Sequence, residues 1–302
     1  MRWFHEAVDR WHGALLRRVV PPVFRCGLDS PAWSVHLAAA QVSLPALTAT
    51  RHYTVTVPTV VGEMQAGFQI SWGPHPELPV LVYHHGIAEM PYDKSFRGIC
   101  RGALSSQAHL VAIRAPLHRT WLEIRSGLPT LAHFVAMCAV ALRLGEAVRQ
   151  AVLARGARGS LVAGLSLGGF LTVLHHLHFG TADMYVPLLA GPDLAHPFLA
   201  THFRRLLAAQ AVAYPAPLRT LLDWRQTLQA SDTQRLRPLL ARYDMTMQYT
   251  HHASCYAVCG IPVVTLARGH ITGSLAFAAL RAHVLACLRT FCPLTGSGRK
   301  KE

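Results

Sequence analysis

The chain of 302 residues has no asparagine and only three lysines, Lys94, Lys300 and Lys301. Its positive charge therefore comes almost wholly from arginines, which are scattered apart from a short basic run at the C-terminal end. The formal net charge of +14 favours an anionic partner, but no nucleic-acid recognition motif accompanies it. We expect no nucleic-acid role and interpret the basic surface as one that attracts acidic substrates or anionic membranes.

Cysteine usage and hydropathy exclude other classes. The seven cysteines form no Cys-x-x-Cys pair, and their odd number leaves no complete disulfide framework, so we expect a cytoplasmic protein with reduced thiols. No apolar signal segment follows the first residues. The longest apolar run, residues 128–142, contains His133 and is too short for a membrane span, which predicts a buried helix.

Residues 1–50 form an extension ahead of the predicted core. Aromatic and aliphatic residues recur there at helical spacing with arginines between them: Trp3, Phe4, Val8, Trp11, Leu15 and Val19. Pro21 and Pro22 end the predicted helix. One interpretation is a helix packed on the domain. The other is an interfacial anchor that gives peripheral membrane contact through residues 1–22, since aromatics with arginines suit a membrane surface.

Residues 51–292 alternate between strand and helix patterns. Eight strands are predicted, at residues 52–57, 67–72, 79–84, 109–114, 160–165, 184–190, 236–242 and 261–267. Long helices are predicted at 130–153 and 274–291. The first two strands suit an antiparallel pair, and helices after the third predict an α/β fold whose mostly parallel sheet is covered on both faces. Residues 191–234 interrupt the alternation as a small cap, and residues 293–302 form a flexible basic tail.

The most informative segment runs from the apolar residues 161–163 into Gly164-Leu165-Ser166-Leu167-Gly168, and a helical pattern follows at once. A Gly-x-Ser-x-Gly sequence between strand and helix is typical of a nucleophile elbow, in which a strained turn exposes the serine hydroxyl. Gly164 and Gly168 let the two elements approach closely. Ser166 is therefore the candidate nucleophile.

A serine nucleophile needs a histidine base and a carboxylate that orients it. His270 follows the last predicted strand, where open α/β sheets place their functional groups. Asp244 follows the strand before it and is the preferred acid. Asp193, after the preceding strand, is the alternative, although Pro-Asp also favours a turn or helix cap.

Negative charge on a tetrahedral intermediate needs hydrogen-bond donors, which form an oxyanion hole. The residue after the nucleophile supplies one donor, the backbone N–H of Leu167. The loop after the third predicted strand, His85-Gly86-Ile87, supplies the second. We assign it to the N–H of Ile87, with Gly86 as the alternative.

These motifs together resemble the α/β-hydrolase superfamily over roughly residues 50–292. The resemblance rests on His85-Gly86, Gly164-x-Ser166-x-Gly168, Asp244 and Gly269-His270 in register. It implies a serine hydrolase of the esterase or lipase type that cleaves a carboxylic ester through an acyl-enzyme, without metal or organic cofactor. An acyltransferase or peptidase with the same triad stays open. So does a membrane-associated or partner-binding protein that keeps the fold without turnover.

The partner implied is a small acyl substrate with a hydrophobic acyl group. Apolar residues of the cap predict its pocket: Phe198, Leu199, Leu206, Leu207 and Trp224. The many histidines do not predict a metal site. On the helix after Ser166 only His175 and His178 have suitable spacing, and no carboxylate lies nearby in sequence.

Overall fold

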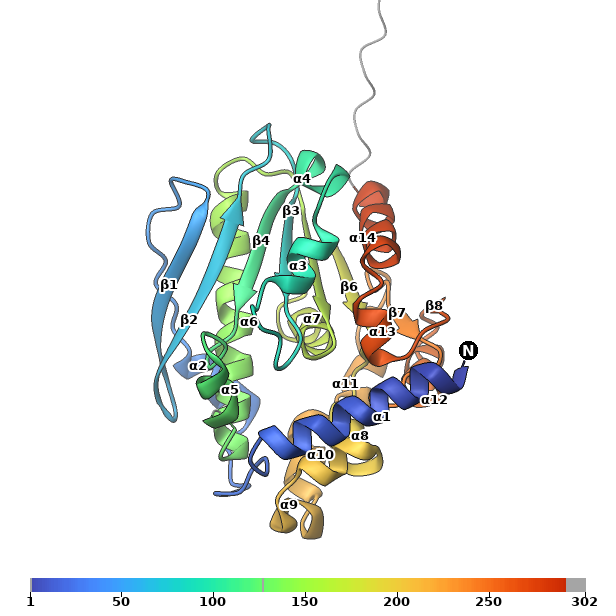
Figure 1. Ribbon diagram of the computed structural model, residues 1–302. Coiled ribbons are helices and arrows are strands. Elements are labelled where there is room, and N and C mark those ends of the chain that lie inside the picture. Colours follow the sequence, from blue (N-terminus) through green and yellow to red (C-terminus); the bar gives the residue numbers. More distant parts are fainter. Residues whose placement is uncertain (1, 127, 292–302) are drawn as a thin grey trace, which may run out of the picture.

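The computed structural model describes residues 2–126 and 128–291, so the predicted tail at 293–302 lies outside the described residues. One eight-stranded sheet runs through the molecule in the order β1-β2-β4-β3-β5-β6-β7-β8 (Figure 1). Its strands are β1 (Arg51–Thr59), β2 (Gly62–Ser71), β3 (Val80–His84), β4 (His109–Arg114), β5 (Ser160–Leu165), β6 (Met184–Leu188), β7 (Leu239–Ala241) and β8 (Val264–Leu266). β2 is antiparallel to both its neighbours and all other pairs are parallel. The expected α/β class with a mostly parallel sheet is confirmed.

Helices cover both faces of this sheet. They are α1 (Arg2–Val19), α2 (Trp33–Ala39), α3 (Lys94–Ile99), α4 (Ala103–Gln107), α5 (Trp121–Ser126), α6 (Leu131–Leu153), α7 (Leu167–His178), α8 (Ala195–Ala200), the 3₁₀ helix η1 (His202–Leu206), α9 (Ala209–Ala213), α10 (Ala216–Leu222), α11 (Arg225–Gln229), α12 (Tyr249–Val258), α13 (His270–Ser274) and α14 (Phe277–Phe291). The central strands are buried on both faces, which explains their continuous apolar sequences.

Alternate residues of one strand serve two separate cores. In β3, Val80 and Val82 pack in the core that contains α6 and α7, whereas Leu81 and Tyr83 pack in the core beneath α3 and α14. The 23-residue helix α6 is long and apolar enough to cross a membrane, but 83% of its most apolar window is buried inside the protein. Its packing against the sheet and α7 makes it a core helix, as its sequence predicts.

The last elements differ from the sequence-based expectation. β7 and β8 are three residues each instead of the seven expected, because Pro238 and Pro262 lie within those runs and lack the backbone donor that a strand needs. The expected closing helix is α14, and the short helix α13 precedes it as a separate element.

The predicted site lies at the carboxyl ends of the parallel strands. Helices α8 to α11, with η1, lie between β6 and β7 in the chain, where an insertion was expected. Helix α1 packs against η1 and α13 and so runs across the same end of the sheet (Figure 1). The N-terminal extension therefore reaches the edge at which loops after the strands converge.

Candidate functional site

Ser166 occupies a strained turn between β5 and α7. Its φ of 56° and ψ of −114° are unfavourable for a residue with a side chain, and such a conformation costs about 1–3 kcal/mol. The two flanking glycines make the turn possible: a side chain at Gly164 would collide with the backbone of Gly168, and one at Gly168 with the carbonyl of His84. The sequence folds this way locally because only glycine permits these approaches.

The structure brings Ser166, His270 and Asp244 into one hydrogen-bonded chain. Ser166 Oγ lies 2.9 Å from His270 Nε2, and His270 Nδ1 lies 2.7 Å from Asp244 Oδ2. The other carboxylate oxygen of Asp244 accepts the backbone N–H groups of Thr246 at 2.8 Å and Met247 at 2.7 Å. These two bonds fix the carboxylate, so that it can hold one orientation of the imidazole.

The environment of His270 favours its protonated form. Burial lowers its pKa, but the charge and hydrogen bond of Asp244, with a further contribution from Asp9, raise the pKa above the ordinary histidine value. A base whose pKa is raised in this way holds a proton taken from Ser166 more strongly than an ordinary histidine does.

Asp9 of helix α1 ties this chain to the N-terminal extension. Its carboxylate is fully buried and accepts three backbone N–H groups: those of Met245 at 3.0 Å, His270 at 2.8 Å and Ile271 at 3.0 Å. Met245 follows Asp244, and His270 begins α13. One carboxylate thus fixes the loop that carries the acid and the loop that carries the base.

The alternative acid, Asp193, lies in a different cluster. Its Oδ1 accepts the backbone N–H of His196 at 2.9 Å, and its Oδ2 lies 2.9 Å from Nε2 of His251. The bond to His196 fits the helix-cap role that the sequence left open. In the part of the chain that the structure describes, no hydrogen bond joins Asp193 to His270.

The same cluster contains one of two groupings of possible metal-ligand side chains in the described residues, and the other is His251, His252 and Cys255. Ligand atoms of Asp193, His196 and His251 lie within 4.8 Å of one another. The two imidazoles are stacked, with centroids 3.7 Å apart and planes 6° apart. Their in-plane lone pairs therefore lie in two parallel planes and do not converge on one ion, and the Arg225 guanidinium lies 3.5 Å from Asp193. This geometry does not suit a cation.

The histidines of α7 pack in the interior. His175 is fully buried, with Nε2 3.3 Å from Glu146 Oε2, and His176 is buried beside Tyr185. Glu146 lies on α6, so a carboxylate is near His175 in space although none is near it in sequence.

The two expected oxyanion donors lie where the elbow meets the loop after β3. Leu167 begins α7, and the first N–H groups of a helix have no intrahelical acceptor. In the loop, the N–H of Gly86 donates to Glu89 Oε2 at 3.1 Å and is occupied. That bond favours Ile87 over Gly86 as the second donor.

The loop after β3 is braced from several sides. His85 Nδ1 donates to the carbonyl of Gly86 at 2.7 Å, and His85 Nε2 accepts the N–H of Ala115 at 3.1 Å. Glu89 also accepts the hydroxyl of Ser95 at 2.8 Å. Burial raises the pKa of Glu89 above its ordinary value. The residue before His85, His84, points into the core against α6.

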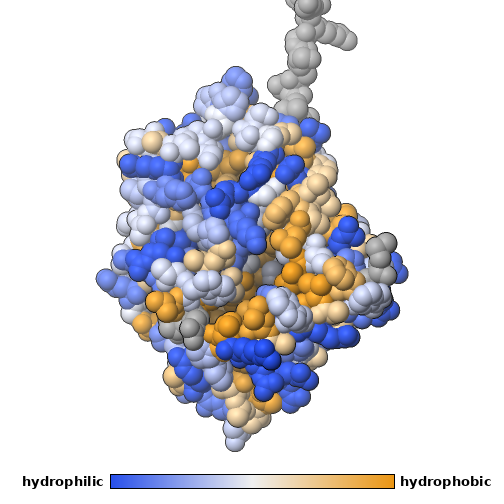
Figure 2. All heavy atoms as spheres, viewed as in Figure 1, coloured by the Kyte–Doolittle hydropathy of each residue, from blue (hydrophilic) through white to orange (hydrophobic). Residues whose placement is uncertain are grey.

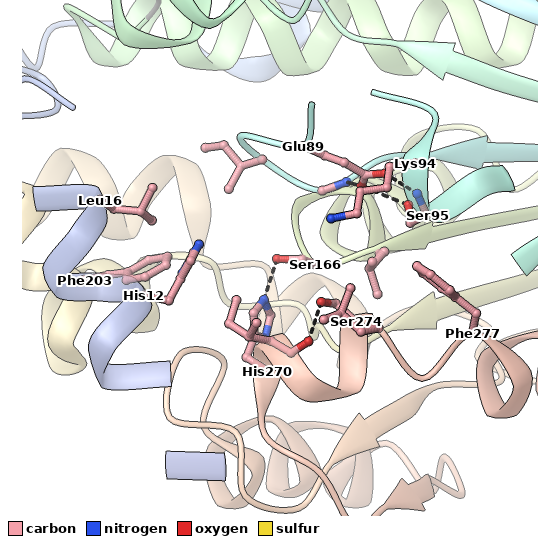
Figure 3. A pocket seen from close by; sticks show the side chains of 15 residues that line it. His12, Leu16, Glu89, Lys94, Ser95, Ser166, Phe203, His270, Ser274 and Phe277 are labelled. Atoms are coloured by element: carbon pink, nitrogen blue, oxygen red, sulfur yellow. Dashed lines mark hydrogen bonds between the residues drawn. The ribbon is translucent and has the colours of Figure 1, made fainter. Parts of the chain in front are cut away.

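Two cavities meet at Ser166. The larger, about 280 Å³, forms an open mouth with mixed lining, and Figure 3 shows His12 and Leu16 of α1 facing Glu89 and Lys94 across it. The smaller, about 70 Å³, runs inward and is lined almost wholly by apolar side chains. Both cavities share Leu16, Ile87, Ser166 and Phe203 in their linings.

The apolar cavity differs in part from the expected acyl pocket. Phe198 and Leu206 line it, as their sequence position predicts. Leu199, Leu207 and Trp224 are not among its lining residues, and Trp224 packs instead against Trp33 and His178. The remaining wall includes side chains of α1, α5, α6, α7, α8 and η1 and of the loops after β3 and β7.

Three site residues were not identified from the sequence: Asp9, His12 and Glu89. Asp9 and His12 share one face of α1 with His5 and Leu16, so the helical spacing was readable. Polar residues on an amphipathic helix normally face solvent, however, and here they face the site. Glu89 belongs to no recognised motif, and only its position close to His85-Gly86 in the sequence could have drawn attention to it.

Comparison with known proteins supports the architecture. No family model and no curated protein matches the chain. Among solved structures, an acylaminoacyl peptidase of Pyrococcus horikoshii superposes with a TM-score of 0.57 at 11% identity, covering 82% of this chain but only 42% of its own. A Pyrococcus furiosus esterase gives 0.55 at 10% identity, covering 83% of this chain and 96% of its own.

A putative hydrolase from Agrobacterium vitis S4 gives a TM-score of 0.55 at 14% identity, with coverage of 80% of this chain and 100% of its own. At such low identity these similarities show the fold but not the substrate. The sheet order, the strained serine turn and these likenesses agree. The chain has the α/β-hydrolase fold.

Proposed function

We propose that this protein is a serine hydrolase that cleaves a carboxylic ester with a hydrophobic acyl group. The observation that carries this proposal is the hydrogen-bonded chain from Ser166 Oγ through His270 to Asp244, which ends at the junction of two cavities. A purely structural serine has no need of a strained backbone, a buried imidazole and a buried carboxylate in this order.

In the first half of the reaction, Ser166 Oγ attacks the acyl carbon while His270 Nε2 takes the hydroxyl proton. The carbonyl oxygen becomes an oxyanion, to which the N–H groups of Leu167 and Ile87 donate. The intermediate then collapses: the ester C–O bond breaks, His270 gives its proton to the leaving alkoxide, and an acyl-serine remains.

In the second half, His270 takes a proton from water and the hydroxide adds to the acyl-serine. Collapse of this intermediate breaks the bond to Ser166 Oγ, which regains the proton from His270 as the acid departs. Asp244 stabilises the imidazolium in both halves and keeps Nε2 directed at Ser166.

The two cavities suggest where the acyl part and the alcohol part of the ester bind. The inner cavity is apolar and suits the acyl chain, because each buried methylene contributes about 0.8 kcal/mol. The open mouth, with Lys94, Ser95 and His12 in its wall, suits a more polar leaving group.

The test is labelling by a fluorophosphonate probe, which reacts with activated serines. We expect wild type to be labelled, Ser166→Ala to be unlabelled and Asp244→Ala to be labelled slowly. Asp193→Ala is the matched control and should label at the wild-type rate. No labelling of folded wild type would overturn the hydrolase proposal. If Asp193→Ala is labelled slowly and Asp244→Ala at the wild-type rate, the acid is Asp193 and not Asp244.

Hydrolysis of p-nitrophenyl esters and of matching p-nitroanilides then separates esterase from peptidase activity. We expect turnover of the esters to exceed that of the anilides. The reverse order would replace the proposed ester specificity with amide cleavage by the same residues.

A further inference from the structure

Helix α1 is amphipathic with its apolar face outward. Its buried residues are His5, Asp9, Gly13 and Leu16, of which three are polar or lack a side chain. Its exposed residues include five large apolar ones: Trp3, Phe4, Trp11, Leu15 and Val19. A surface helix of a globular protein normally turns its apolar stripe toward the core. This orientation leaves a hydrophobic surface that needs a partner.

The five apolar side chains lie on one side of the helix. At about 100° per residue they span an arc of about 160° on the outer side of the helix. Trp3 and Trp11 are 73% and 67% exposed, so no other described part of the chain covers them. Figure 2 shows hydrophobic side chains gathered on this face of the molecule, around the hollow beside α1.

Arginines lie within and beside this surface. A groove of about 670 Å³ between α1 and η1 is lined by Arg10, Arg17, Arg18 and Arg205, and no carboxylate is among its lining residues. Arg10 has Glu6 at 3.7 Å, whereas the other three form no ion pair within the described part of the chain. The groove is therefore a concave site of uncompensated positive charge beside an exposed apolar strip.

The opposite flank of α1 borders the mouth at Ser166. His12 and Leu16 line that mouth together with Ile271 and the half-exposed Leu275. A surface that touched the outer side of α1 would thus have the arginine groove on one side and the mouth on the other.

We propose that α1 docks this protein on an anionic lipid bilayer. The aromatic and aliphatic face lies at the depth of the headgroups, and the arginine groove binds lipid phosphates. Charge selects this occupant: a hydrophobic strip flanked by unpaired guanidinium groups is complementary to a surface that is apolar within and anionic at its boundary. Entry of an ester from the bilayer into the mouth would follow, and that last step alone rests on the proposed function.

The test is co-sedimentation of the full chain with vesicles of phosphatidylcholine alone or mixed with phosphatidylglycerol. We expect binding to the mixed vesicles that weakens with salt, and little binding to phosphatidylcholine alone. Trp3→Ala with Trp11→Ala should lower binding at least tenfold. Arg17→Ala with Arg18→Ala should lower it about 25-fold, at about fivefold for each arginine near the surface.

Trp121→Ala is the matched control, because Trp121 is a half-exposed tryptophan outside α1, and it should bind as wild type does. Hydrolysis of a water-soluble ester, or thermal unfolding if no ester is cleaved, verifies that each variant is folded. Failure of wild type to bind the mixed vesicles overturns the proposal. If light scattering instead shows a dimer that Trp3→Ala with Trp11→Ala dissociates, a second copy of the chain covers this face and the proposal is wrong.

Discussion

The carboxylate of Asp9 accepts the backbone N–H of His270 at 2.8 Å, across 261 positions of sequence. The same carboxylate binds Met245, next to Asp244, so the two loops that must present acid and base in register share one anchor. The N-terminal helix therefore helps to hold the candidate site together.

We expect Asp9→Asn to lower kcat by about 10- to 100-fold, since small misplacements of reacting groups cost this much. KM should change little, because Asp9 lines neither cavity at Ser166. The midpoint of the pH dependence of kcat/KM should also fall, because the charge of Asp9 contributes to the raised pKa of His270. Steady-state kinetics between pH 5 and 9 on a water-soluble ester measure all three quantities.

Glu6→Ala is the control for Asp9→Asn, since Glu6 is a carboxylate on the same helix that pairs with Arg2 and Arg10 at the surface. It should leave kcat and the pH midpoint unchanged. The positioning role of Asp9 is refuted if Asp9→Asn only lowers the amount of folded protein. In that case kcat per folded molecule and the pH midpoint of kcat/KM would equal those of wild type.

The raised pKa of His270 sets the pH dependence of the proposed reaction. The base must be unprotonated, so kcat/KM should rise with pH through a midpoint above the ordinary histidine value of about 6.5. Asp244→Asn removes the charge and alters the hydrogen bond that raise this pKa. We expect its midpoint to move down and its kcat to fall about 10³- to 10⁴-fold. An unmoved midpoint would show that another group titrates in the wild-type profile.

The same shift has a consequence for folding. Because the pKa of His270 is higher in the folded than in the unfolded state, the folded state binds the proton more tightly. This contribution to stability is fully present below the unfolded-state pKa and is lost as the pH rises through the folded-state pKa. The Asp244→Asn variant should lack it, which urea unfolding at pH 5 and pH 8 can measure.

Local patterns in the sequence predicted the fold and the elbow because both depend on local chemistry. Continuous apolar runs and Gly164-x-Ser166-x-Gly168 are visible without tertiary contacts. The strand β7 is shorter than predicted because Pro238 lies in the predicted run, and a prediction based on hydrophobicity alone ignores this proline. The role of Asp9 could not be predicted, because its partners are backbone N–H groups from distant loops and no side-chain pattern marks them. The same holds for the outward apolar face of α1.

Two glycines close to Ser166, Gly168 and Gly86, should differ sharply in their tolerance of a side chain. A methyl group at Gly168 would collide with the carbonyl of His84, whereas one at Gly86 would meet its nearest atom, the carbonyl of Leu165, at 3.5 Å. We expect Gly168→Ala to lose several kcal/mol of unfolding free energy or to fail to fold, since overpacking costs about 1–3 kcal/mol and the backbone here cannot yield. Gly86→Ala should keep its fold and a measurable rate. Equal urea midpoints for the two variants would contradict this account of the elbow.

The division of the substrate between two cavities can be tested at Phe203, which lines both of them. Phe203→Ala should widen the inner cavity and raise the kcat/KM ratio of octanoyl over butanoyl p-nitrophenyl ester at least tenfold, because each methylene accommodated in such a pocket is worth about 1–3 kcal/mol. Phe277 lines only the mouth, so Phe277→Ala is the matched control and should leave this ratio unchanged. If Phe277→Ala shifts the acyl preference and Phe203→Ala does not, the acyl chain occupies the mouth, and the alcohol must then leave through the apolar cavity.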